Sequence, residues 1–225
     1  MQKFILLLLL SIFVSCSNDF SNRRAFLKIE RYIVDKKCVN FCKNNSTMSA
    51  TASSFIFKHK KDVSYLLTAG HVCLPAPNYN KKLFKEHFLA VSLDGNYYSV
   101  VVKRISQKYD LCLLKTSRIN LPVMEISTNP ADTSEEITNI AATQGVFGEN
   151  MVMYYDGRYS GESEDAAIYS IPAAGGSSGS PILRKDGTVI GVVSAVNRNF
   201  NHITISPKLF QIRLFLEGLL WVIKI

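Results

Sequence analysis

Short runs of apolar residues separated by turn residues make up most of the chain after Met48. Residues 88–93 and 97–105 are two such runs, and they flank the turn 94–96, where Gly95 accepts a positive φ, so a β-hairpin is predicted. Further strand-like runs occupy residues 53–57, 63–68, 110–115, 136–143, 150–155, 166–171, 188–196 and 202–205. Because strands at this density do not alternate with helices, the pattern predicts an all-β sandwich or barrel.

A different spacing precedes these strands. Within residues 22–37, Phe26, Ile29 and Ile33 recur on one helical face, while the basic residues fall mostly elsewhere. This predicts a short basic amphipathic helix or arm. It would either contact an anionic membrane or a partner, or pack on the body of the protein with its basic side in solvent.

The last part of the chain shows helical periodicity again. Ser206 is a suitable N-cap, and Pro207 suits the first helical position. The apolar residues on one face are Leu209, Ile212 and Leu216. We expect a helix over residues 207–222 that docks on the surface of the β-domain, because its interspersed charges exclude a membrane span.

The first 15 residues have the pattern of an export signal. Lys3 precedes an apolar run over residues 4–14, which is too short to span a bilayer, and the small residue Ser15 follows. Val14-Ser15-Cys16 resembles a bacterial lipoprotein signal, in which the chain is cut before a cysteine that then carries lipid. Cleavage after Ser17, which would give a freely secreted protein, is the alternative.

Charge is distributed unevenly along the 225 residues, which carry a net charge of +8. Residues 1–62 contain 11 Lys and Arg against 4 acidic residues, whereas residues 63–225 contain 15 against 14. The remainder of the chain is therefore nearly neutral. A basic groove across the whole fold is not expected, and neither is binding to nucleic acid.

The chain has five cysteines. If Cys16 carries lipid, Cys38, Cys42, Cys73 and Cys112 remain, an even number that an oxidising compartment would allow to form disulfides. The spacings of these cysteines to each other and to His71 do not form a recognisable zinc pattern, so no metal site is predicted.

Three segments carry residue types suited to acyl transfer. They are YLLTAGH at residues 65–71, YDLCLL at 109–114 and GGSSGSP at 175–181. Each is weak evidence alone, but together they supply a serine hydroxyl, an imidazole to take its proton and a carboxylate to orient that imidazole. Gly176 would also let the backbone turn so that its N–H and that of Ser178 point at a developing oxyanion.

The segments LLTAGH, YDLCLL and GSSGSP resemble the catalytic-site segments of the chymotrypsin-fold, trypsin-like serine proteases, in the same order along the chain. The likeness is closer to bacterial members of the Htr and glutamyl-endopeptidase kind. It implies a protease domain over residues 45–225, built of two six-stranded antiparallel β-barrels at about 45–116 and 121–205 and the C-terminal helix. Residues 16–44 would then form a basic N-terminal arm.

The resemblance also implies roles for individual residues. Ser178 corresponds to the nucleophile, His71 to the general acid and base, and Asp110 to the carboxylate that orients the histidine. The backbone N–H groups of Gly176 and Ser178 would form the oxyanion hole. Neither a metal nor a cofactor would be needed.

In the family, the residues before the serine turn and those on a later strand form the substrate pocket. Here these are Pro172, Ala173, Ser194, Ala195 and Val196. They include no acidic residue to pair with arginine or lysine, and the side chain of Val196 would narrow the entrance. We therefore expect cleavage after small or medium apolar residues.

Two cysteine pairs are plausible disulfides. Cys73 lies two residues after His71 and Cys112 two after Asp110, so the pair could bridge if those segments meet. Two buried free thiols are the alternative. Cys38 and Cys42 could close a small local loop.

These features predict an exported serine endopeptidase that acts on proteins or peptides. It would be periplasmic, anchored at the cell surface by a lipid on Cys16 with the help of the basic arm, or secreted. The alternative is a catalytically silent, protease-like binding module at the cell surface.

Overall fold

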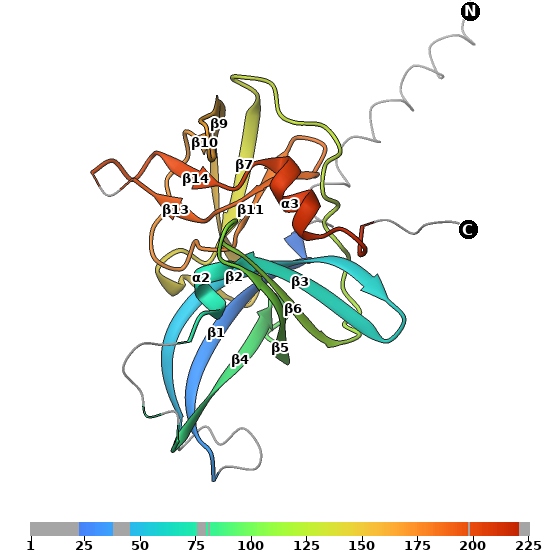
Figure 1. Cartoon of the computed structure of the whole chain (residues 1–225), viewed down its shortest axis with the longest axis vertical. Coiled ribbons are helices and arrows are strands. Elements are labelled where there is room, and N and C mark those ends of the chain that lie inside the picture. Colours follow the sequence, from blue (N-terminus) through green and yellow to red (C-terminus); the bar gives the residue numbers. More distant parts are fainter. Residues whose placement is uncertain (1–22, 38–45, 76–79, 81, 198, 221–225) are drawn as a thin grey trace, which may run out of the picture.

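The computed structural model describes residues 23–37, 46–75, 80, 82–197 and 199–220 (Figure 1). Most of these residues form antiparallel strands, which confirms the all-β prediction. The first group of strands is β1 (Phe26–Asp35), β2 (Ser46–Lys60), β3 (Val63–Ala69), β4 (Phe84–Ser92), β5 (Tyr97–Ser106) and β6 (Leu111–Ser117). A one-turn helix, α2 (Gly70–Cys73), follows β3 directly.

The first six strands close into a barrel in the order β1-β2-β3-β6-β5-β4. In this barrel β1 pairs with β2 on one side and with β4 on the other, so that Arg31 lies opposite Ala50 and Phe88. The expectation of a helix or a separate arm over residues 22–37 is therefore wrong. The physical reason is that Leu27 and Ile29 alternate into the barrel core, and their burial together with two ladders of hydrogen bonds outweighs a local helical spacing.

The second unit is a curled, eight-stranded sheet. Its main path runs β12-β11-β7-β9-β10-β14-β13, and β8 pairs with β9 beside it. The strands are β7 (Glu136–Ala141), β8 (Phe147–Gly148), β9 (Met151–Glu162), β10 (Ala167–Tyr169), β11 (Pro181–Arg184), β12 (Val189–Val192), β13 (Ala195–Val196) and β14 (Thr204–Ser206). A short 3-10 turn, η2 (Thr143–Gly145), follows β7. The chymotrypsin-like arrangement of two β-units is confirmed, and the second is a curled half-barrel.

The C-terminal helix α3 (Leu209–Phe215) is shorter than expected. Ser206 does not cap it, because that residue belongs to β14 and its hydroxyl donates to the carbonyl of Pro207. The helix buries Leu209, Ile212 and Phe215 against the body of the protein, so the predicted docking is confirmed. No described helix is both long and apolar enough to cross a membrane.

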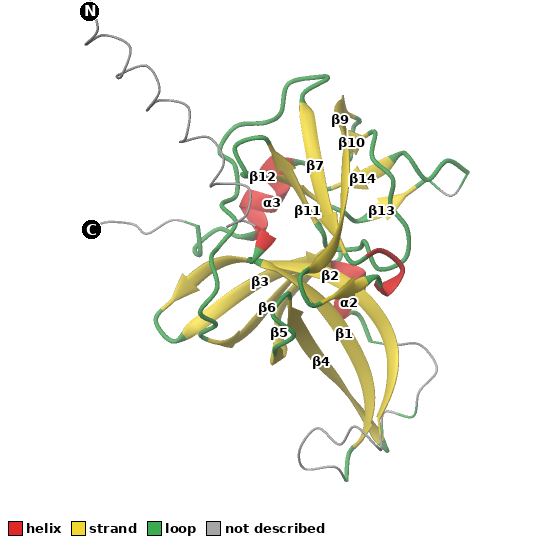
Figure 2. Ribbon diagram, turned by 180° about the vertical axis from the view of Figure 1, so that it is seen from behind, coloured by secondary structure: helices red, strands yellow, loops and turns green. Residues whose placement is uncertain are grey.

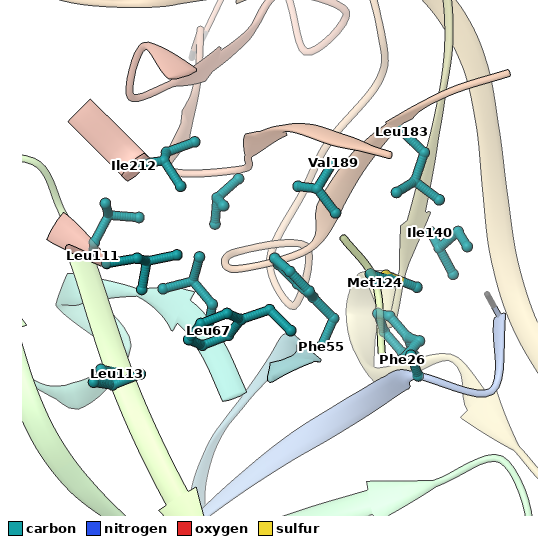
Figure 3. Close-up of a cluster of buried hydrophobic side chains, with 14 of the residues drawn as sticks. Phe26, Phe55, Leu67, Leu111, Leu113, Met124, Ile140, Leu183, Val189 and Ile212 are labelled. Carbon is teal, nitrogen blue, oxygen red and sulfur yellow. The ribbon is translucent and has the colours of Figure 1, made fainter. Parts of the chain in front are cut away.

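One apolar cluster joins both units and the helix (Figure 3). The first barrel contributes Phe55, Leu67 and Leu111, the second unit contributes Leu183 and Val189, and α3 contributes Ile212; all are almost fully buried. From in front and behind, α2 lies where the two units meet (Figures 1 and 2). This shared core fixes the two units against each other and so holds that junction in place.

Candidate active site

His71 is placed by the close approach of α2 to the start of β6. A Cβ atom on Gly70 would lie 2.8 Å from the backbone nitrogen of Leu111 and 2.9 Å from the carbonyl carbon of Asp110, so only glycine fits. The pairing of β3 with β6 brings the same two segments together, because Ala69 at the end of β3 lies opposite Leu111 at the start of β6. The sequence segments that contain His71 and Asp110 therefore meet at one end of the first barrel.

Asp110 holds the imidazole of His71 through several hydrogen bonds. His71 Nδ1 lies 2.9 Å from Asp110 Oδ2 and 3.1 Å from Oδ1, and the backbone N–H of His71 donates to Oδ1 at 2.7 Å. An ionised carboxylate only accepts hydrogen bonds, so this arrangement places the proton of the neutral ring on Nδ1. Nε2 is then left as an acceptor.

The Asp110 carboxyl has a further donor, the hydroxyl of Ser194. Burial raises the pKa of Asp110, but the hydrogen bonds from His71 and Ser194 outweigh burial, and the pKa lies below its ordinary value. Asp110 is therefore ionised at neutral pH. Sequence reasoning placed Ser194 only in the substrate pocket, and the structure adds this contact.

Ser178 comes from the other unit and meets His71 across the junction. Its Oγ lies 2.8 Å from His71 Nε2, the nitrogen that is left as an acceptor. The three residues named from the sequence are thus brought into one chain of hydrogen bonds. The His71 side chain is 45% exposed, so a substrate can reach the pair.

Ser53 on β2 holds the turn that carries Ser178, and no sequence motif marked it. Its backbone N–H donates to the carbonyl of Ser178 at 2.8 Å, and its hydroxyl donates to the carbonyl of Gly176 at 2.8 Å. The same hydroxyl accepts a hydrogen bond from the N–H of Ala142. Ser53 is fully buried, so these bonds fix the turn to the first barrel.

The turn presents two backbone donors beside Ser178 Oγ. Gly176 has a φ of +90°, and a Cβ atom there would lie 2.3 Å from the carbonyl oxygen of Ala142. Within the described part of the chain, the N–H groups of Gly176 and Ser178 donate to no acceptor. Unsatisfied donors at such a position can bind a negatively charged oxygen.

The predicted pocket residues flank this turn on two segments of the second unit. Pro172 and Ala173 precede the turn, and the N–H of Ala173 donates to the carbonyl of Asn201. Ala195 and Val196 form β13, which pairs with β14. Val196 is partly buried and Ala195 is exposed.

Cys73 and Cys112 form a disulfide that ties α2 to β6, with a Cα–Cα distance of 6.3 Å. This is the first of the two cysteine pairs considered from the sequence. Cys16, Cys38 and Cys42, with the predicted signal peptide, lie outside the described residues. Within residues that are described, no group of three or more His, Cys, Asp and Glu side chains could hold a metal ion.

Comparisons with known proteins agree with this architecture. The family model of the trypsin-like peptidase domain matches residues 52–192. Among solved structures, the serine endoprotease from Yersinia pestis has a TM-score of 0.69 at 17% identity, covering 91% of this chain and 66% of its own. The active form of the Rv3671c protease from M. tuberculosis has a TM-score of 0.66 at 14% identity, covering 90% and 84%.

This chain thus spans slightly less than two thirds of the Yersinia structure. A comparison with curated proteins found no match. The solved structures share the fold at low identity, and the family model covers more than half of the chain. The chain therefore belongs to the trypsin-like peptidase domain family and has a chymotrypsin-like fold.

Proposed function

We propose that the protein is an exported endopeptidase that hydrolyses peptide bonds through Ser178, His71 and Asp110. The observation that carries this proposal is the continuous chain of hydrogen bonds from Asp110 Oδ2 through the His71 ring to Ser178 Oγ, at 2.9 and 2.8 Å. Such distances lie within the range needed for direct proton transfer.

In the first step, His71 Nε2 takes the proton of Ser178 while Oγ attacks the carbonyl carbon of the scissile bond. The resulting imidazolium is stabilised by the ionised Asp110. His71 then gives its proton to the nitrogen of the leaving amine, the C–N bond breaks, and an ester on Ser178 remains. Water activated by His71 hydrolyses this ester and restores the serine.

The N–H groups of Gly176 and Ser178 would stabilise the negative oxygen of both tetrahedral intermediates. Neither group donates to another acceptor within the described residues, which supports this role. Such a pair of donors acts mainly on the transition state, because the oxygen gains charge only there.

The substrate pocket would accept small or medium apolar side chains on the acyl side of the scissile bond. Pro172, Ala173, Ala195 and Val196 offer apolar surface and no carboxylate that could pair with arginine or lysine. Cleavage of a peptide library is the test. A dominant arginine, lysine or glutamate at the position before the scissile bond would contradict the preference.

Export rests on residues 1–16 of the sequence alone. We propose that the signal peptide ends at Ser15 and that Cys16 carries lipid, which would tether the protease to a membrane. Metabolic labelling with a radioactive fatty acid should mark the wild type and not the variant Cys16→Ala. Label in neither protein would instead indicate secretion in free form.

The function itself is tested by hydrolysis of casein and of peptide amides. We expect Ser178→Ala to lower hydrolysis by about 10⁴-fold or more, because the nucleophile is removed. Ser170→Ala is the matched control, since Ser170 is exposed and bonds only to the backbone of Arg158 in the described residues. Equal hydrolysis by both variants would contradict the proposal.

A folded wild type that hydrolyses neither substrate would favour the silent binding module. Hydrolysis of simple esters without cleavage of peptides would indicate an esterase instead.

A further inference from the structure

The peptide that links Gly175 to Gly176 carries one of the two proposed oxyanion donors, the N–H of Gly176. Its carbonyl oxygen, on Gly175, accepts a hydrogen bond of 2.6 Å from the backbone N–H of Gln144 in η2. No cis peptide bond occurs in the described residues, and in a trans peptide the carbonyl and the N–H point in opposite directions. The hydrogen bond from Gln144 therefore turns the Gly176 N–H away from η2.

The reverse orientation of this peptide would be unfavourable for two reasons. The N–H of Gly176 would face the N–H of Gln144, so that two donors would meet without an acceptor. The carbonyl oxygen of Gly175 would point to where the Gly176 N–H now points, and it would repel a negatively charged substrate oxygen there. The direction of one N–H in η2 thus decides whether the turn can offer this donor to a substrate.

Gln144 makes its hydrogen bond from an unusual backbone conformation. Its φ is 54° and its ψ is 23°, in the left-handed region that residues with a Cβ atom rarely adopt. The side chain is exposed and has no hydrogen-bond partner among the described residues, so it does not hold this conformation itself. A strained residue beside the turn of Ser178 indicates a functional constraint, and the constrained group here is the N–H of Gln144.

A pair of hydroxyl groups holds η2 against the same turn. Thr143 Oγ1 lies 2.8 Å from the Oγ of Ser177, a fully buried residue that stands between Gly176 and Ser178. The N–H of Ala174 donates to the same Ser177 oxygen at 3.3 Å. Loss of the Thr143 hydroxyl would leave the buried hydroxyl of Ser177 with one hydrogen bond fewer, and it would remove a side-chain connection between η2 and the turn.

We propose that Thr143 is a positioning residue, whose hydroxyl holds η2 so that the N–H of Gln144 fixes the direction of the Gly176 N–H. Thr143 acts through the turn and not by contact with the substrate. This inference rests on the proposed function of Ser178 and deepens it, because it names the groups that aim one donor of the oxyanion hole.

The first test compares Thr143→Val with Thr143→Ser. Valine has the shape of threonine without the hydroxyl, whereas serine keeps the hydroxyl. We expect Thr143→Val to lower kcat and kcat/KM equally, by about tenfold, because the lost orientation is used only in the transition state. Thr143→Ser should restore kcat to within about twofold of the wild type. A wild-type kcat in Thr143→Val, or a change that appears only in KM, would overturn the inference.

Binding of a peptide aldehyde reports on the oxyanion hole without turnover. Ser178 Oγ adds to the aldehyde carbon, His71 takes the hydroxyl proton, and the former carbonyl oxygen becomes the negative oxygen. In Thr143→Val the inhibition constant should rise by the same factor by which kcat/KM falls, because the adduct resembles the transition state. A lower kcat with an unchanged inhibition constant would show that Thr143 does not act on the oxyanion hole.

Thr116→Val is the matched control. Thr116 is partly buried like Thr143, and its hydroxyl also makes a hydrogen bond of 2.8 Å, to the carbonyl of Ser99. It lies near the end of β6 that is remote from Leu111 and the site. We expect Thr116→Val to keep the wild-type kcat and inhibition constant, and an equal loss in both valine variants would contradict the inference. Circular dichroism in the near ultraviolet verifies that each variant is folded.

The backbone of Gln144 provides a second test. A β-branched residue is strongly disfavoured at a left-handed φ, whereas glycine adopts it freely. We expect the kcat of Gln144→Gly to exceed that of Gln144→Val by about tenfold. Lys61→Val is the control and should keep the wild-type kcat, because Lys61 is exposed and has a φ of 51° in the turn between β2 and β3. Equal kcat values for the two Gln144 variants would overturn the inference, and this pair decides it even if Thr143→Val does not fold.

The wild type separates this inference from the proposed function. If the wild type cleaves peptides and kcat responds to neither the Thr143 nor the Gln144 substitutions, only the positioning role is overturned. If the folded wild type neither cleaves peptides nor reacts with a fluorophosphonate, both proposals are overturned.

Discussion

At the scale of single residues, two serine hydroxyls other than that of Ser178 hold the geometry of the proposed triad. Ser53 ties the turn of Ser178 to the first barrel, and Ser194 donates to the carboxylate of Asp110. Both act by fixing groups that would otherwise have several orientations. Positioning of this kind is a large part of what a protein scaffold contributes to catalysis.

Replacing Ser194 by alanine removes a hydrogen bond to the ionised Asp110. Because that bond lowers the pKa of Asp110, the variant should have a higher pKa and should be less stable than the wild type by about 2 kcal/mol at neutral pH. The folded-state pKa of Asp110 lies below the ordinary pKa of 3.8 for an aspartate. The contribution is therefore present above 3.8 and is lost as the pH falls through the folded-state pKa.

Urea unfolding of wild type and Ser194→Ala at neutral pH and in strongly acidic buffer measures this effect. The difference between their free energies of unfolding should shrink in acid. A difference that stays constant over the whole range would show that Ser194 does not act through the charge of Asp110.

The variant Gly176→Ala tests the proposed oxyanion hole. In Gly176→Ala the added Cβ would collide with the carbonyl of Ala142, and the turn must move its N–H groups away from the substrate oxygen. We expect kcat to fall by about 10²- to 10³-fold. Gly95→Ala is the control, since Gly95 also has a positive φ but nothing lies within 4 Å of its Cβ position. An equal loss in both variants would indicate a general effect of backbone strain.

At the scale of elements, β1 shows where local patterns mislead. Leu27 and Ile29 alternate as in a strand, but the next inward position holds the charged residue Arg31, which interrupts the apolar pattern. The apolar residues Phe26, Ile29 and Ile33 then show a spacing of three to four residues, which is typical of a helix. In the fold Arg31 is buried with Glu86 across the pairing of β1 with β4, a partner more than 50 residues away. No local pattern contains that partner.

The disulfide between Cys73 and Cys112 links α2 to β6 and closes a loop of 39 residues. Loop-closure entropy predicts that its removal in Cys73→Ala/Cys112→Ala destabilises the fold by about 4 kcal/mol. Because α2 carries His71, we also expect this double variant to lose hydrolysis at a lower denaturant concentration than the one at which the whole fold unfolds. Unfolding of the double variant that matches oxidised wild type would contradict this.

At the scale of the whole molecule, the site exists only when the two units are docked. His71 and Asp110 come from the first barrel, whereas Ser178 and Ser194 come from the second unit. The core that joins the units includes residues of α3, among them Ile212 (Figure 3). Burial of this shared core therefore keeps the side chains of the proposed triad within reach of one another.

The sequence was sufficient for the fold class and for the three residues that meet at the junction. His71, Asp110 and Ser178 could be named because each stands in a motif that resembles a segment of the family, and the proposed chemistry needs these three residue types together. The sequence did not predict the contacts of Ser53 or Arg31, because these contacts depend on pairing between distant segments of the chain. The interpretation of residues 22–37 as a basic arm was also wrong for two of its charges. Lys28 and Arg31 form ion pairs with Glu30 and Glu86 in the barrel.

The most direct measurement is to locate a covalent adduct on the folded protein. The full chain is treated with a fluorophosphonate, digested and mapped by mass spectrometry. We expect one adduct, on Ser178, which is lost in His71→Ala because the serine then has no base. A folded wild type without adduct, or an adduct on Ser177 or Ser180, would contradict this expectation.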